Sequence, residues 1–393
     1  MGKASVIASI ARTPIGSFQG KLSTVPAVHL GATVIKETVK RAGIYTEEVN
    51  EVIMGNVLSA GVGQAPARQA AIFGGLPESV ECMTINKVCG SGLKAVMLAD
   101  QAIRCGDAEV VIAGGMENMS QAPYYLMDAR DGMRMGHKKC VDALIHDGLW
   151  DPYGNMHMGN CAEVMAKEEN YTREMQDSFA VESYRRSMEA IENGSLRDEI
   201  VAVEIPQRKG EAVIVDTDEE PGRGKPDKIG KLRPAFDKEG TITAANASSI
   251  NDGAAALTIM SKEKAEQLDV SPLCRIVAQI SVAHEPLYFT TAPGKAITKV
   301  LIKSGLSIED IDLFEINEAF SNVTLAAMRE HSISHDKVNI HGGAISLGHP
   351  IGASGARILV TLISALQQRQ KERGLATLCI GGGEAAALIV EII

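Results

Sequence analysis

One cysteine stands where a reactive thiol would be useful. In the stretch INKVCGSGLKAVMLADQAI (85–103), Cys89 lies among glycine and serine, directly before apolar residues with helical spacing. The preceding run ECMTIN favours a strand, so we expect a helix to begin near Gly90. Free amide N–H groups and the helix dipole should lower the pKa of a thiol at that position and make it a nucleophile. The alternative is a buried structural cysteine, since cysteine is among the most buried residue types.

Three further glycine-rich turns carry polar or reactive side chains: NEAF (317–320), GGAISLGHPIGASGAR (342–357) and CIGGG (379–383). Taken singly, each has a plain structural explanation. Asn317 would cap a helix or a turn, His349 before proline would hold a turn, and Cys379 after LATL would be a buried strand cysteine. Whether these residues form a catalytic site depends on whether the fold brings the four turns together.

The elements around these turns alternate between strand and helix patterns. Strands are expected at 4–10, 49–57, 107–120, 271–283 and 310–320, and helices at 27–43, 66–75 and 294–307. Between about 121 and 244 this pattern degrades into Met-, Gly- and charge-rich sequence with one helical island at 162–194. We therefore predict an α/β fold interrupted by a large inserted loop domain.

The two ends of the chain resemble each other. Residues 87–120 can be laid over 350–387, which places Gly92 on Gly355, and Cys89 and Gly352 become equivalent turn positions. Two similar βα-repeat halves could pack as one five-layered αβαβα body, with a site where corresponding turns meet. The predicted domains are an N-terminal half at 1–120 completed by about 245–270, the loop domain at 121–244, and a C-terminal half at 271–393.

Bulk composition excludes several classes of protein. A net charge of −10 argues against broad nucleic-acid binding. The seven cysteines are dispersed and form no CxxC pair, so no metal site is expected. No secretory signal and no membrane-length apolar run is present, which favours a cytoplasmic protein. A Rossmann dehydrogenase is disfavoured because no GxGxxG with a following acidic residue occurs after a strand.

The order and wording of the four turns resemble the thiolase family, and within it the acetoacetyl-CoA thiolases. The resemblance runs along essentially the whole chain and includes RTPIGSFQG, GGMENMS, HMG and NASSINDGAAA. It implies a thiolase fold and exchange of two acetyl-CoA with acetoacetyl-CoA plus CoA through an acetyl-cysteine. CoA would be substrate and product, no cofactor would be needed, and the protein would be a homo-oligomer, a dimer or a tetramer. The rivals are a broad-range 3-ketoacyl-CoA thiolase of β-oxidation and a CoA-binding scaffold with impaired chemistry.

The resemblance also implies catalytic roles. Cys89 would take the acyl group and His349 would accept its proton. Cys379, with a pKa poised near neutrality, would remove or return the α-proton of the second acetyl-CoA. One oxyanion hole would consist of His349 and a water held by Asn317, and the other of the backbone N–H groups of Cys89 and Gly381.

The remaining predicted contacts are to the acyl group and CoA. The resemblance places His157 and Met158 at a short-acyl pocket, and Ala244 and Ser248 along the pantetheine arm. Phe236, Phe289 and Phe320 would form its apolar walls, and Arg223 would lie at the nucleotide end.

Two departures from the family pattern concern this site. Glu384 and Ala385 follow the triple glycine where the family usually has a glycine at the second position, and an inward carboxylate would raise the pKa of Cys379. Pro221 and Gly222 stand where many relatives have an arginine for the CoA nucleotide, so Arg223 or Lys225 would have to replace it.

Overall fold

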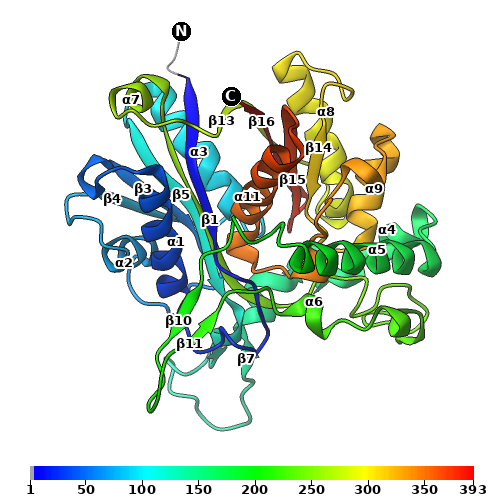
Figure 1. Ribbon diagram of the computed structural model, residues 1–393. Coiled ribbons are helices and arrows are strands. Elements are labelled where there is room, and N and C mark those ends of the chain that lie inside the picture. Colours follow the sequence, from blue (N-terminus) through cyan, green and yellow to red (C-terminus); the bar gives the residue numbers. More distant parts are fainter. Residues whose placement is uncertain (1–3) are drawn as a thin grey trace.

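The computed structural model describes residues 4–393, in which ten strands form one mixed sheet. Nine of them follow the order β14-β15-β16-β13-β1-β12-β5-β3-β4, and β2 (Gly16–Ser17) pairs with β12 (Figure 1). In chain order these nine are β1 (Ser5–Arg12), β3 (Glu51–Gly55), β4 (Glu81–Ile85), β5 (Val110–Asn118), β12 (Asn251–Ser261), β13 (Cys274–Ala283), β14 (Leu313–Ile316), β15 (Arg373–Ile380) and β16 (Glu384–Ile392).

The sheet consists of two parts joined at a narrow seam. Strands β1, β12, β5, β3 and β4 form one part, and β13, β16, β15 and β14 form the other. Between them, β1 and β13 pair only through Val6↔Arg275 and Ile7↔Cys274. The structure thus links the two expected half-sheets edge to edge along a short stretch.

Helices lie on both outer faces and between the two parts of the sheet. They are α1 (Ala27–Ala42), α2 (Pro66–Phe73), α3 (Ser91–Cys105), α8 (Ala292–Ser304), α9 (Ser321–His331) and α11 (Ile351–Arg369). Figure 1 shows α1 and α2 outside the N-terminal part and α8 and α9 outside the C-terminal part, with α3 and α11 side by side in the middle. A core cluster of residues from α3, α11 and both parts of the sheet fills the centre. The predicted five-layered α/β arrangement is confirmed.

The two middle helices touch at the glycines that the internal repeat pairs. A Cβ on Gly355 would lie 2.3 Å from the backbone nitrogen of Leu93, and a Cβ on Gly92 would lie 2.7 Å from the backbone nitrogen of Ala356. Only glycine allows backbones to approach so closely. The repeat seen in the sequence is therefore also the contact point of the two halves.

The inserted segment is poor in strands, as its sequence indicated. Its elements are β6 (Tyr124–Tyr125), β7 (Val141–Asp142), η3 (Leu144–Leu149), β8 (Trp150–Asp151), β9 (Met156–His157), α4 (Met158–Glu168), α5 (Arg173–Glu192), β10 (Val203–Ile205), β11 (Val213–Val215), α6 (Glu220–Arg223) and η4 (Pro226–Lys231). The single helical island predicted at 162–194 is two helices. Thr172 separates them, because its hydroxyl accepts a hydrogen bond from Met175 N at 3.3 Å and caps α5.

Short helices complete the fold: η1 (Thr46–Glu48), η2 (Met119–Gln121), α7 (Lys262–Gln267), η5 (Pro286–Thr291), η6 (His335–Lys337) and α10 (Ala344–Leu347). Within residues 4–393, no helix combines the length and the apolar character that crossing a membrane requires.

Candidate active site

A cavity of about 520 Å³ lies where the two halves and the inserted segment meet. Twelve of the thirteen predicted site residues line it, from all three parts of the chain. They are Cys89, His157, Met158, Arg223, Phe236, Ala244, Ser248, Phe289, Phe320, His349, Cys379 and Gly381. The thirteenth, Asn317, is buried behind the wall formed by Ala319 and Phe320.

A strained turn presents Cys89 to this cavity. Val88 has φ +46°, a left-handed conformation that is rare for a β-branched residue. Two local hydrogen bonds hold the turn: Val88 N donates to Asn86 Oδ1 at 2.9 Å, and Lys87 N donates to Ser91 Oγ at 2.8 Å. Helix α3 begins at Ser91, close to the expected start.

The predicted lowering of the Cys89 pKa is wrong. Burial, with a smaller contribution from the nearby Glu117 carboxylate, raises the pKa of Cys89 to about 11. The backbone N–H groups of Gly381 and of Cys89 itself act in the opposite direction, but desolvation of the thiolate outweighs them. Cys89 is therefore a thiol at neutral pH and needs a base at the moment of attack.

His349 is uncharged at neutral pH, as a base that accepts the Cys89 proton must be. Burial, with a smaller contribution from the Arg357 charge, lowers the pKa of His349 to about 3, so the ring is neutral. Its Nδ1 lies 2.6 Å from Ser354 Oγ, and that hydroxyl donates its one proton to the Pro350 carbonyl at 2.9 Å. Ser354 must then accept a proton from Nδ1, which leaves the lone pair on Nε2. Nε2 is buried and has no hydrogen-bond partner among residues 4–393.

Ser354 is a functional residue that we did not single out from the sequence. It lies five residues after His349, within the first turns of α11 (Ile351–Arg369), so its position relative to the histidine follows from the helix. A serine within reach of GHP was the available signal. Its bond to Pro350 follows the local pattern in which a serine in a helix donates to the carbonyl four residues before it.

Cys379 lies near the end of β15 and is 1% exposed. Its pKa is raised well above the ordinary value, first by burial and then by the charge of Cys89. The predicted pKa near neutrality is therefore wrong for the resting site, chiefly because burial removes the water that would stabilise the thiolate. The turn that follows needs glycine: Gly382 and Gly383 have φ +89° and +83°.

Asn317 follows β14 directly and is 1% exposed. Its amide oxygen lies 3.4 Å from Arg357 Nη2. Its amide nitrogen has no acceptor in the part of the chain that the structure describes. A buried amide with unused N–H groups is suited to donating to an oxygen atom of a ligand or a water.

Aromatic rings form the apolar part of the cavity. The His157 ring stacks on Phe236 at 4.9 Å between centroids, and Phe320 meets both Phe236 and Phe289 edge to face at 6.1 Å. His157 Nδ1 also accepts a hydrogen bond from Gly159 N and so caps α4. This cap fixes the adjacent Met158 at the start of that helix, on the cavity wall.

The polar end of the cavity lies at α6. Arg223 lines it and keeps 57% of its side chain exposed, with an ion pair to Glu219 at 3.8 Å. Lys225, the other candidate for binding the CoA nucleotide, does not line the cavity. Phe18 and Glu220 also line the cavity and were not predicted.

The departure at Glu384 has a simple structural outcome. Its carboxylate forms an ion pair with Lys87 in the nucleophile turn. Burial and the neighbouring Cys89, and not Glu384, raise the pKa of Cys379. Glu384 therefore ties the two catalytic turns together at their partly exposed edge.

No group of three or more His, Cys, Asp or Glu side chains among residues 4–393 is arranged to hold a metal ion.

Comparisons with known proteins agree with this geometry. The model of the thiolase N-terminal domain matches residues 5–263, and that of the C-terminal domain matches 270–392. The chain belongs to the thiolase family. It is 53% identical to an acetyl-CoA acetyltransferase of Pseudomonas aeruginosa, with 98% of both chains covered, and 54% identical to one of Cupriavidus necator, again with 98% of both covered.

Two solved structures have the same fold. A thiolase of Ascaris suum in complex with coenzyme A has a TM-score of 0.94 and 44% identity, with 100% of both chains covered. The Bacillus anthracis acetyl-CoA acetyltransferase has a TM-score of 0.97 and 41% identity, with 100% of this chain and 99% of that chain covered.

Proposed function

We propose that the protein is an acetyl-CoA C-acetyltransferase, which interconverts two acetyl-CoA with acetoacetyl-CoA and CoA. The observation that carries the proposal is the joint position of Cys89, Cys379 and the neutral His349 on one cavity wall. Relatives at about half identity along the full chain carry the name of this activity. CoA, acetyl-CoA and acetoacetyl-CoA are thus the proposed ligands.

The first half-reaction acetylates Cys89. His349 Nε2 takes the thiol proton while the sulfur attacks the thioester carbon. The backbone N–H groups of Cys89 and Gly381, which favour charge on the sulfur in the free site, donate to the oxyanion. CoA then leaves as a thiol with the proton returned by His349.

The second half-reaction forms or breaks the carbon–carbon bond. Acetylation of Cys89 removes the neighbouring ionisable thiol, one of the two causes that raise the Cys379 pKa. Once its own thiol proton has passed to solvent, Cys379 can act as the base that takes an α-proton from the second acetyl-CoA, while the Asn317 amide, through a water in the family mechanism, binds the enolate oxygen. The enolate attacks the acetyl group, the bond between the acetyl carbon and the Cys89 sulfur breaks, and the Cys89 thiolate takes the proton that Cys379 removed.

The walls of the cavity support a short acyl group. Met158 and Phe236 belong to one apolar cluster with Cys379, and the His157 ring stacks on Phe236. The broad-range 3-ketoacyl-CoA thiolase is the rival that this feature disfavours.

The test is CoA-dependent cleavage of 3-ketoacyl-CoA thioesters from acetoacetyl upward. Wild type, Cys89→Ala and the matched control Cys105→Ala, an exposed thiol at the far end of α3, are compared. Activity confined to acetoacetyl-CoA and absent only in Cys89→Ala supports the proposal. Comparable rates on long chains would favour a β-oxidation enzyme, and no cleavage with intact CoA binding would favour a scaffold.

We also propose that the protein works as a homo-oligomer. Strand β4 ends the sheet, and its edge and the 44% exposed Met83 are open to pairing. The segment at 124–135 adds exposed apolar side chains, including Met127 and Met135. Light scattering on the purified chain tests this, and a monomer at micromolar concentration would contradict it.

A further inference from the structure

We propose that Arg357 is a positioning residue that orients the Asn317 amide for enolate stabilisation. This inference rests on the function proposed above. Arg357 does not line the cavity, and its hydrogen-bond contact with the site is to Asn317 Oδ1.

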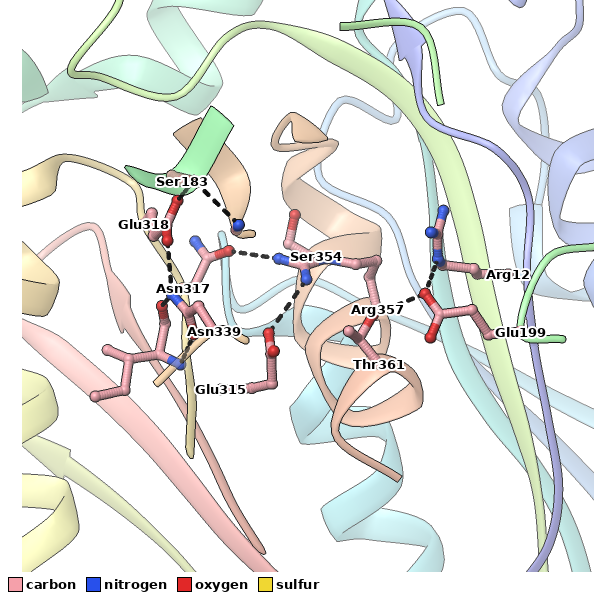
Figure 2. A network of polar contacts seen from close by, with 12 residues as sticks. Arg12, Ser183, Glu199, Glu315, Asn317, Glu318, Asn339, Ser354, Arg357 and Thr361 are labelled. Atoms are coloured by element: carbon pink, nitrogen blue, oxygen red, sulfur yellow. Dashed lines mark hydrogen bonds and ion pairs between the residues drawn. The ribbon is translucent and has the colours of Figure 1, made fainter. Parts of the chain in front are cut away.

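The guanidinium lies between a carboxylate and the amide (Figure 2). Arg357 Nη1 is 3.4 Å from Glu315 Oε2, and Nη2 is 3.4 Å from Asn317 Oδ1. All three side chains are at most 3% exposed. The two contacts are long, but they involve a full charge in an interior with a low dielectric constant.

The chemistry of the guanidinium decides which way the amide faces. Arginine has five N–H donors and no acceptor, so only the oxygen of Asn317 can face it favourably. The amide nitrogen must then point the other way, where it has no acceptor among residues 4–393. Without the cation, the two orientations of the amide would differ little in energy, and one of them would turn an acceptor toward the enolate.

Helix α11 carries Arg357 and also reaches a second part of the buried polar network. Thr361, one helical turn further, donates to Glu199 Oε1 at 3.0 Å. Glu199 is also paired with Arg12 at 2.5 Å, and Arg12 with Asp218 at 2.7 Å. Figure 2 shows the contacts of Glu199 with Arg12 and Thr361 apart from those of Arg357 with Glu315 and Asn317.

One helix therefore orients two side chains of the proposed site. Ser354 fixes the tautomer of His349, the proposed base, and Arg357, three residues later on the same face, fixes Asn317. A rigid element that carries both positioning groups holds the base and the amide in a constant relation to each other. A merely structural Arg357 is the competing explanation, since a buried ion pair can often be replaced by apolar residues without loss of stability.

The experiment separates the two half-reactions. The charge-balanced double variant Arg357→Met/Glu315→Gln is compared with wild type in two assays. Exchange of the acetyl group between acetyl-CoA and isotope-labelled CoA needs only Cys89 acetylation, whereas condensation to acetoacetyl-CoA also needs the enolate. We expect condensation to fall about 10²-fold, the size of losing one oxyanion donor. Exchange should change less than about threefold, because its oxyanion is held by backbone N–H groups.

A mutant cycle and a matched control make the result specific. Adding Asn317→Ala to the double variant should cause little further loss, since both changes remove the same interaction. Thr361→Val is the control: it lies on the same helix in the same network but contacts Glu199 instead of Asn317. It should leave the ratio of condensation to exchange unchanged.

Equal losses in both assays, or losses that multiply when Asn317→Ala is added, would overturn the proposal. If the double variant does not fold, Arg357→Lys and Glu315→Gln are measured singly. Lysine keeps the charge and should retain part of the condensation rate with normal exchange. A failure of the proposed function is recognisable separately, because wild type would then form no acetoacetyl-CoA.

Discussion

The two halves of the molecule share one repeat but contribute different chemistry. Laying 86–92 over 349–355 puts Cys89 of the N-terminal half opposite Gly352, and His349 of the C-terminal half opposite Asn86. Ser91 and Ser354 are also equivalent positions, and both halves have serine there. Each serine forms a hydrogen bond within its own turn, Ser91 with Lys87 N and Ser354 with His349 Nδ1. The two turns therefore have equivalent positions in the repeat. They differ in the residue at one position each, which gives one turn the nucleophile Cys89 and the other the base His349.

Available space explains why the roles are not exchanged. A Cβ on Gly352 would lie 2.6 Å from Glu117 Oε2, so a cysteine has no room there. Residues 45–57 also resemble 307–319, which places Gly55 opposite Asn317. A Cβ on Gly55 would lie 2.6 Å from Ser91 Cβ. The two halves are similar in backbone and complementary in side chains.

The largest expected effect tests this division of roles. Cys89→Ala should lower condensation and thiolysis about 10⁴-fold or more, because the acyl acceptor is lost. Adding Gly352→Cys should not restore activity, since the equivalent position has no space. Steady-state rates measure both, and recovery in the double variant would show that the halves are interchangeable.

The close contact between α3 and α11 can be tested by measuring the free energy of unfolding. Gly355→Val should cost about 3 kcal/mol or more, because its side chain would collide with the backbone of Leu93. Gly230→Ala, where a Cβ meets nothing within 4 Å, is the control and should change stability by less than about 0.5 kcal/mol. Denaturant unfolding measures both variants. Similar values for the two would mean that the crossing of α3 and α11 is not tight.

The two thiols should differ in reactivity. Because the Cys89 pKa is about 11, alkylation of Cys89 by iodoacetamide should rise about tenfold per pH unit between about pH 6 and about pH 9. Cys379, more deeply buried and with a pKa raised further, should react more slowly. Peptide mapping by mass spectrometry follows each site. A plateau for Cys89 near pH 7 would instead indicate a thiolate stabilised by the helix N-terminus.

The smallest effect is expected at the ion pair that links the two turns. Glu384→Gln should change stability by less than about 1 kcal/mol and activity by less than about threefold, since both partners are partly exposed. Lys87→Met is the companion variant with the same expectation. Thermal unfolding and condensation rates measure these changes. A large activity loss confined to Glu384→Gln would show that the carboxylate itself takes part in catalysis.

Much of the fold was predictable because its signals are local. Apolar periodicity predicts most strands and the first middle helix, α3, and glycine positions reveal the repeat. The helical island expected at 162–194 is divided by the cap at Thr172, which the apolar pattern does not show. The candidate site was predictable where motifs carried it, and twelve of thirteen named residues line one cavity.

The sequence by itself determined the order of elements, the repeat, the family and the identity of the reactive side chains. Only the tertiary structure decided their protonation and orientation. The pKa values of Cys89 and His349 depend on which groups displace water around them, and residues distant in the chain supply that burial. Likewise, the face that Asn317 presents is chosen by Arg357, whose guanidinium meets the amide only after α11 has packed between the two parts of the sheet. The contact of Ser354 with His349, in contrast, is local in the chain.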